Sequence, residues 1–247
     1  MKAVAALIAA LLPIGLSAQQ SDEIIEIRSS SALSIKTDRA YFLFRTYSPN
    51  GAPKIDPVFL RIPSLDEVAR PEQLKTLKNL QKVDSGRAFE KRGLERTYLI
   101  EARAGRYVLY GVAGGGLVVL SVCNCLGTVG FDAEAGLITD LGYILSDRAD
   151  QRSSIAELAP ETGFGPGVNG ETVLIAQTVR PPTATMPLPD ALKSSTIKPA
   201  RYHAVGPFIE PRALLINRMV AVPGILAYDG GKVIDVSAGS STPRSAD

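Results

Sequence analysis

One uncharged stretch in the middle of the chain limits what this sequence can fold into. Residues 107–131 read YVLYGVAGGGLVVLSVCNCLGTVGF, 25 consecutive residues without a charged side chain. Three adjacent glycines, Gly114, Gly115 and Gly116, interrupt the stretch, and each glycine costs a helix about 1 kcal/mol relative to alanine. The valines on both sides of the glycines are β-branched and favour strands. The stretch therefore predicts two buried strands joined at the glycines.

The first residues of the chain indicate export. Residues 1–18 read MKAVAALIAALLPIGLSA, in which Lys2 precedes an apolar run that ends before Pro13. This layout is typical of a secretory signal peptide, with cleavage predicted between Ala18 and Gln19. The apolar run is too short to span a bilayer, which needs about 20 residues. Gln19 stands where a lipoprotein cleavage box requires cysteine, so a lipid anchor is not expected. We expect a periplasmic or secreted mature protein.

The charges around the central stretch argue against a second membrane segment. In an exported chain the later flank of a span would face the cytoplasm. That flank carries Asp132 and Glu134, whereas Arg103 and Arg106 lie on the outer side. This distribution inverts the positive-inside rule. We therefore expect no stable membrane span after signal cleavage.

Composition excludes several classes of protein. Hydrophobic residues make up 45% of the chain and charged residues 21%, both ordinary values for a globular protein. The net charge is +2, and removal of Lys2 with the leader leaves 26 basic against 25 acidic residues. Nucleic-acid binding needs a clustered basic face that neutralises phosphates. No nucleic-acid partner is therefore expected.

Turn residues at intervals of 8–12 residues predict a mainly β fold, an antiparallel β-sandwich. The expected strands lie at 23–28, 32–36, 40–47, 57–62, 97–102, 106–112, 117–123, 127–133, 137–145 and 171–179. One helix is expected near residues 65–83, because Ser64 and Glu67 form a capping box and leucines recur at helical spacing after Pro71. Residues 84–96 are charged and contain glycine, which predicts a surface loop.

The predicted organisation has five parts. Residues 1–18 are the signal peptide, and residues 19–179 form the β-sandwich domain with the helical insertion. Residues 180–202 are a proline-rich crossing, since four prolines fall within 180–190. Residues 203–236 supply C-terminal strands that pack on the same domain, with a hairpin expected around Asp229-Gly230-Gly231. Residues 237–247 are a disordered tail.

Residues 100–145 contain a pattern that resembles a group of known proteins. The segments AGRYVLYGV and GTVGFDAEAGLITDLGYI are similar to strands of bacterial envelope β-sandwich proteins of unknown function, prealbumin-like or immunoglobulin-like. The matching positions are Gly105, Tyr107, Leu109, Phe131, Gly136, Leu141, Gly142 and Ile144. The resemblance implies an exported sandwich in the cell envelope. It carries no catalytic residue.

The two cysteines, Cys123 and Cys125, are separated by Asn124. Three interpretations remain open: two buried structural thiols, a local disulfide, and a soft-metal or redox site. Asn124 tolerates the left-handed backbone that a bridge between such close cysteines would need. A zinc site would lack two ligands, and only His203 could supply imidazole.

No catalytic constellation is apparent. A Ser-His-Asp hydrolase would have to use His203, the sole histidine, and no G-x-S-x-G elbow presents a serine. The acids that could pair in space are Asp140, Asp147, Asp150, Glu161 and Glu171. The sequence therefore predicts no catalytic, cofactor-binding or metal-ligating residue.

Our first hypothesis is an exported, non-enzymatic envelope protein that binds an envelope protein or surface partner or has a structural role. One alternative is a periplasmic hydrolase that uses carboxylates or a metal. The other is a thiol- or metal-handling module at Cys123 and Cys125.

Overall fold

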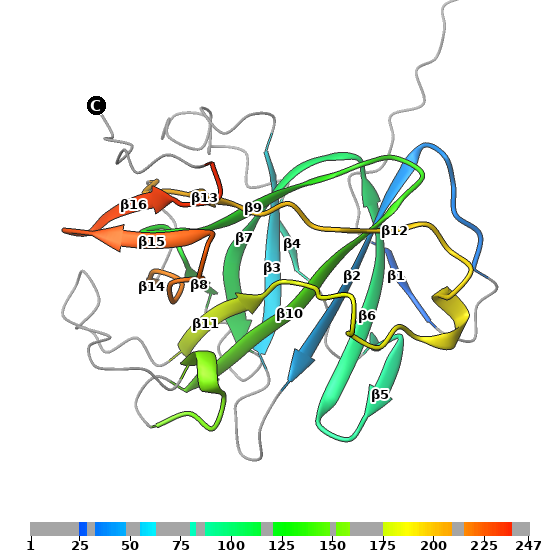
Figure 1. Cartoon of the computed structure of the whole chain (residues 1–247), viewed down its shortest axis with the longest axis horizontal. Helices are drawn as coiled ribbons and strands as arrows, with labels where there is room; N and C mark the ends of the chain where they lie inside the picture. The colour runs from blue at the N-terminus through cyan, green and yellow to red at the C-terminus, as the bar shows by residue number, and fades with distance from the viewer. Residues whose placement is uncertain are drawn as a thin grey trace, which may run out of the picture.

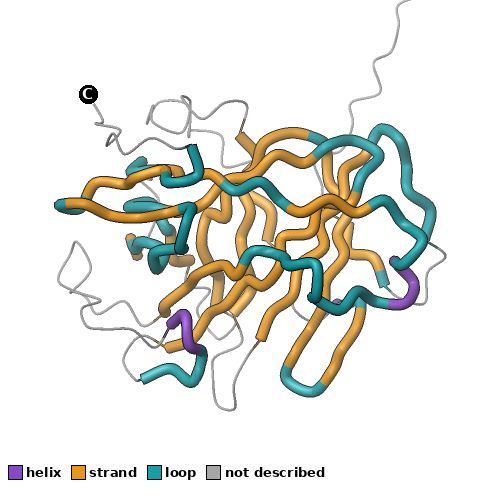
Figure 2. Tube along the Cα trace, in the orientation of Figure 1, coloured by secondary structure: helices purple, strands orange, loops and turns teal. Residues whose placement is uncertain are grey.

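The computed structural model describes residues 25–28, 33–47, 55–62, 80–82, 87–114, 121–148, 152–158, 175–208 and 215–238. Within these residues the strands form two mixed sheets, one of them curled into a half-barrel, and a small separate hairpin (Figure 1). The helical parts of the described chain are short turns (Figure 2). The predicted mainly β fold is confirmed. The predicted cleavage site at Ala18 and Gln19 lies outside the described residues.

Sheet A and sheet B each contain seven of the described strands. Sheet A has the order β1 (Ile25–Ile27), β6 (Glu95–Arg103), β2 (Arg39–Tyr47), β10 (Ile138–Arg148), β11 (Ile175–Arg180), with β5 (Glu90–Arg92) beside β6 and β12 (Ile197–Pro199) beside β10. Sheet B has the order β13 (His203–Val205), β9 (Thr128–Ala133), β7 (Gly105–Gly114), β3 (Ile55–Ile62), β4 (Leu80–Lys82), with β8 (Ser121–Cys123) beside β7 and β14 (Leu215–Ile216) beside β8. The hairpin consists of β15 (Leu226–Asp229) and β16 (Lys232–Asp235).

The prediction of a purely antiparallel arrangement is wrong. In sheet A, β2 and β10 run parallel, with Tyr41 opposite Ile138 and Arg45 opposite Tyr143. The pairs β10·β12 and β8·β14 are also parallel. Parallel neighbours need a long crossover. The chain between β2 and β10 supplies one, because it contributes most of sheet B before it returns. Turn signals along the sequence report only local connections, so they did not indicate this pairing.

Three local predictions are corrected. The helix near 65–83 lies largely outside the described residues, but 80–82 form strand β4, paired with Val58–Leu60. Backbone hydrogen bonds with the edge of β3 outweigh the local helix propensity of these residues. The expected loop at 84–96 contains the β5–β6 hairpin, which turns at Gly93 with φ of 60°. Residues 33–36 form no strand, and the Lys36 N–H donates instead to the Tyr41 hydroxyl at 3.0 Å.

The central stretch and the C-terminal hairpin form strands as predicted. The central uncharged stretch forms strands β7 and β8, which pair antiparallel on either side of the glycines. Among the described residues there is no helix long and apolar enough to cross a membrane. Asp229 and Lys232 close the β15–β16 hairpin, as the Asp-Gly-Gly signal predicts.

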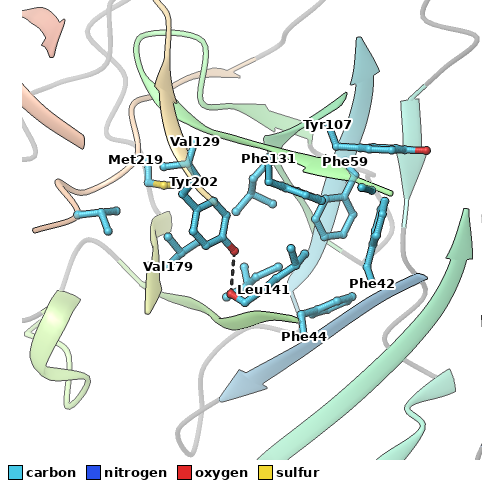
Figure 3. Packing of buried hydrophobic residues seen from close by; sticks show 14 of the residues in the cluster. Phe42, Phe44, Phe59, Tyr107, Val129, Phe131, Leu141, Val179, Tyr202 and Met219 are labelled. Atoms are coloured by element: carbon cyan, nitrogen blue, oxygen red, sulfur yellow. Dashed lines mark hydrogen bonds between the residues drawn. The ribbon is translucent and has the colours of Figure 1, made fainter. Parts of the chain in front are cut away.

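Aromatic side chains fill the space between the sheets (Figure 3). Alternate residues of β2, Phe42 and Phe44, point to this side, where they meet rings from sheet B. The Phe42 ring centroid lies 4.7 Å from that of Tyr107 and 5.2 Å from that of Phe131, both with edge-to-face geometry. Such pairs contribute about 0.5–1.5 kcal/mol each beyond the area they bury.

The opposite side of sheet A is also covered. Residues 181–196 cross it, and Leu188 and Leu192 pack against Tyr41, Leu43 and other outward side chains of the sheet. This explains why β2 is buried on both faces over most of its length.

Candidate functional site

A buried ion pair joins the two parallel strands of sheet A to the segment that crosses them. Arg45 of β2 is fully buried, and its Nη1 donates to Asp140 Oδ1 of β10 at 2.8 Å. Arg45 Nη2 also donates to the Pro187 carbonyl at 3.0 Å. The Gly142 N–H donates to Asp140 Oδ1 at 2.9 Å. These bonds satisfy both charges inside the protein, so the pair fixes the strands and the crossing in one arrangement.

A row of polar and aromatic side chains continues from this pair across the outer face of sheet A. The register places Arg45, Tyr143 and Arg180 side by side on β2, β10 and β11. The guanidinium carbons of Arg45 and Arg180 lie 5.9 and 5.3 Å from the centroid of the Tyr143 ring, within cation–π range. The Tyr143 hydroxyl donates to Glu95 Oε2 at 2.5 Å.

Arg180 also forms a bidentate salt bridge with Glu157, in which the Arg180 Nη2 lies 2.7 Å from the Glu157 Oε2. We call Glu95, Tyr143, Glu157 and Arg180 the Tyr143 network. Tyr47 lies beside it, opposite Glu95 in the β2–β6 ladder and opposite Leu145 in the β2–β10 ladder, with 36% of its surface exposed. The network and Tyr47 thus form a partly exposed strip.

Three members of the network, Tyr143, Glu157 and Arg180, have pKa values shifted away from neutral pH. Burial raises the pKa of Tyr143 to about 12, and the hydrogen bond to Glu95 adds to the shift. The hydrogen bond from Arg180 lowers the pKa of Glu157, and the same contact raises the pKa of Arg180. These shifts move the three pKa values away from pH 7, the range in which a general acid or base works best. The three side chains can donate and accept hydrogen bonds, and the Tyr143 ring can stack against a partner group.

The two cysteines are bonded to each other and buried. Cys123 and Cys125 form a disulfide with a Cα–Cα distance of 5.1 Å, and both are at most 1% exposed. They pack among apolar side chains of sheet B, such as Val58 and Val108. Bonded sulfurs are not metal ligands, and no cluster of three or more His, Cys, Asp or Glu side chains occurs within the described residues. The redox state of the pair in the cell stays a prediction.

The bridge acts on local shape more than on the entropy of the unfolded chain. A loop closed over about three residues restricts the unfolded chain by only about 1.6 kcal/mol at 25 °C. Two residues of extended strand span about 6.5 Å, so the pair holds this short segment in a tighter turn than a strand allows.

The remaining candidates do not form a catalytic group. His203 lies on β13 opposite Gly130, and a Cβ at that glycine would stand 2.6 Å from the imidazole Nε2. The Ser153 hydroxyl donates to Asp147 Oδ2 at 2.5 Å and accepts from the Ile155 N–H at 3.0 Å, which orders the turn after β10. The histidine belongs to sheet B, whereas the Ser–Asp contact borders sheet A.

Of the five scattered acids, Asp140 pairs with Arg45 and Asp147 accepts a hydrogen bond from Ser153. The other three, Asp150, Glu161 and Glu171, lie outside the described residues.

Sequence reasoning did not find the Tyr143 network. Its members come from four segments, and Tyr143 meets Arg45 only because β2 and β10 are parallel, with a register shift between Asp140 and Tyr143. No local motif marks these positions.

No family model matches the chain, and no curated protein and no solved structure shows significant similarity to it.

Proposed function

We propose that the chain is an exported protein of the bacterial cell envelope that binds a partner or has a structural role and does not act as an enzyme. We also propose that its two sheets form a β-sandwich of the prealbumin-like or immunoglobulin-like kind, modified by parallel pairs. The signal-peptide pattern supports export. The bonded cysteines suit an oxidising compartment outside the cytoplasm.

The Tyr143 network with Tyr47 is the observation that supports binding. Tyrosine and arginine are enriched at protein interfaces because they combine apolar area with hydrogen-bonding groups. Here each polar group is already oriented by a neighbour, as Arg180 is by Glu157, so little side-chain entropy would be lost on contact. The partner we propose is an envelope protein or another surface component.

The two alternatives gain no specific support. A carboxylate hydrolase needs two acids that converge on one bond. Glu95 and Glu157, the acids of the network, are each bonded to another side chain, Tyr143 and Arg180 respectively. A thiol-handling module needs an accessible sulfur, and both sulfurs here are buried.

Site-specific photocrosslinking tests the binding surface. The full chain, leader included, is expressed in a Gram-negative host with a benzophenone amino acid in place of Tyr47, or in place of exposed Lys232 as the control. We expect the Tyr47 probe, but not the Lys232 probe, to crosslink one discrete envelope component, and Arg180→Ala to reduce that product. Equal labelling from both positions, or a probe-bearing chain that stays in the cytoplasm, would contradict the proposal.

A further inference from the structure

The C-terminal part of the chain contacts sheet B through the β13–β9 and β14–β8 ladders and through the segment Cys123–Gly127, which we call the disulfide turn. The backbone of this turn carries four hydrogen bonds to the C-terminal part. The Asn217 N–H donates to the Cys123 carbonyl at 2.7 Å, and the Phe208 N–H donates to the Cys125 carbonyl at 2.8 Å. The Leu126 N–H donates to the Asn217 carbonyl at 3.0 Å, and the Met219 N–H donates to the Gly127 carbonyl at 2.8 Å. Both cysteine carbonyls are therefore acceptors for the C-terminal segment.

Side chains extend these contacts in two directions. Asn124, between the cysteines, donates through Nδ2 to Gln177 Oε1 of β11 at 2.6 Å, and both side chains are buried. The Tyr228 ring packs on Gly127, where an added Cβ would stand 2.6 Å from the ring edge. The Tyr228 hydroxyl donates to the Met219 carbonyl at 2.7 Å. The turn thus joins sheet A, sheet B and the β15–β16 hairpin.

The described part of the C-terminal segment, 203–208 and 215–238, is a cap on the main core. Met219, Val222, Leu226 and Val233 from this cap belong to the same buried cluster as the aromatic rings between the sheets. In Figure 1 the hairpin lies at the left end of the two sheets. Loss of the cap would expose one end of the core to water.

We propose that the Cys123–Cys125 disulfide holds this cap against the two sheets, a role that we call the latch. The fold is then completed only where the cysteines are oxidised. The bridge holds the two cysteine residues 5.1 Å apart at their Cα atoms and so fixes the direction of the carbonyls that accept from Asn217 and Phe208. A reduced pair permits the extended spacing of about 6.5 Å. We expect the two carbonyls then to lose their alignment with the N–H groups of Asn217 and Phe208. The inference rests on the proposed export, which supplies the change of compartment.

The closing step is a thiol–disulfide exchange with a disulfide-bearing oxidoreductase. One cysteine thiolate attacks the donor disulfide, forms a mixed disulfide and releases one donor thiolate. The second cysteine thiolate then attacks the sulfur of the first, the S–S bond forms, and the second donor sulfur leaves. The two cysteines lose two electrons and two protons, and the donor becomes a dithiol. Because both sulfurs are buried once the cap is closed, the exchange takes place on the open form.

Hydrogen exchange of the purified full chain tests the latch. Oxidised protein is compared with protein that is unfolded and refolded in a phosphine reductant, with two alkylatable thiols as proof of reduction. We expect the amides of Phe208, Asn217 and Met219 to exchange at least about tenfold faster in the reduced chain, while those of β2 and β6 keep their rates. Unchanged cap rates would overturn the proposal. A reduced chain that fails to refold, or that exchanges faster throughout, would also overturn it, because the bridge would then serve the whole fold.

A matched variant separates reduction from side effects of the reductant. The double substitution Cys123→Ala, Cys125→Ala should show fast cap exchange with and without reductant. If this variant does not fold, the comparison of oxidised and reduced native sequence still decides. The hydrogen-exchange result does not depend on where the protein is located in the cell. A chain that stays in the cytoplasm refutes the proposed export, whereas equal exchange rates in oxidised and reduced protein refute the latch.

Discussion

Arg45 and Asp140 are 95 residues apart in the chain, yet their side chains meet across two parallel strands with 2.8 Å between Nη1 and Oδ1. The contact lies beneath the Pro-rich crossing and includes the Pro187 carbonyl. The same pairing of β2 and β10 sets Arg45 beside Tyr143. One long-range alignment therefore determines both the buried pair and the partly exposed strip.

Removal of one partner of this pair should be costly. Asp140→Ala leaves the Arg45 guanidinium buried without its counter-charge, and such losses cost about 3–5 kcal/mol. Urea unfolding should show this loss, or a variant that does not fold. Asp132→Ala is the control, because both side chains of the Asp132–Arg106 pair are exposed. Loss of this pair should cost less than about 1 kcal/mol. Equal effects of the two substitutions would contradict the role given to the buried pair.

Two glycines with the same backbone conformation should respond differently to alanine. Gly136 and Gly142 have φ of 76° and 71°, which alanine adopts at a cost of about 1–2 kcal/mol. A Cβ at Gly136 would meet no atom closer than 3.7 Å. At Gly142 it would clash with the Arg180 carbonyl oxygen of β11 and would stand 2.7 Å from the Pro182 nitrogen and 2.8 Å from the Pro181 carbonyl carbon. We expect Gly136→Ala to lower the melting temperature modestly and Gly142→Ala to lower it much further. Similar melting temperatures would argue that the end of β11 and the start of the crossing do not lie against β10 at this point.

The Tyr143 network should make stability fall at high pH. The pKa of Tyr143 is raised to about 12 in the folded protein, whereas an unfolded tyrosine titrates near 10. The stabilisation is therefore fully present below about pH 10 and is lost as the pH rises toward 12. Tyr143→Phe should remove this contribution and flatten the fall in unfolding free energy between about pH 10 and 12. Four other tyrosines also have raised pKa values, so the difference between variant and parent is the quantity to measure. A variant curve parallel to that of the parent would count against the assignment.

The sequence indicates strands well where the signal is local and poorly where it is not. Alternation and turn residues predict the 40–47 strand, the split central stretch and the hairpin at Asp229-Gly230-Gly231, and these form as expected. The leucine stripe before β4 is a local helical signal, yet 80–82 pair with β3, because an available sheet edge can outweigh helix propensity.

The candidate site is harder to predict, because strand orientation decides it. Alternation places Arg45 and Tyr143 on faces of their own strands but says nothing about which strand lies beside which. The cysteine pair is different, since Cys-Asn-Cys is visible as a motif. Its connection to Asn217 and Phe208 still depends on folding, because those residues come more than 80 positions later.

Intact mass spectrometry of protein purified from the periplasm of an expressing host tests export and oxidation together. We expect a chain that begins at Gln19 and is about 2 Da lighter than the same chain after reduction, the mass of the two hydrogens lost on forming one bridge. A species that retains residues 1–18, or one whose mass does not change on reduction, would contradict this expectation.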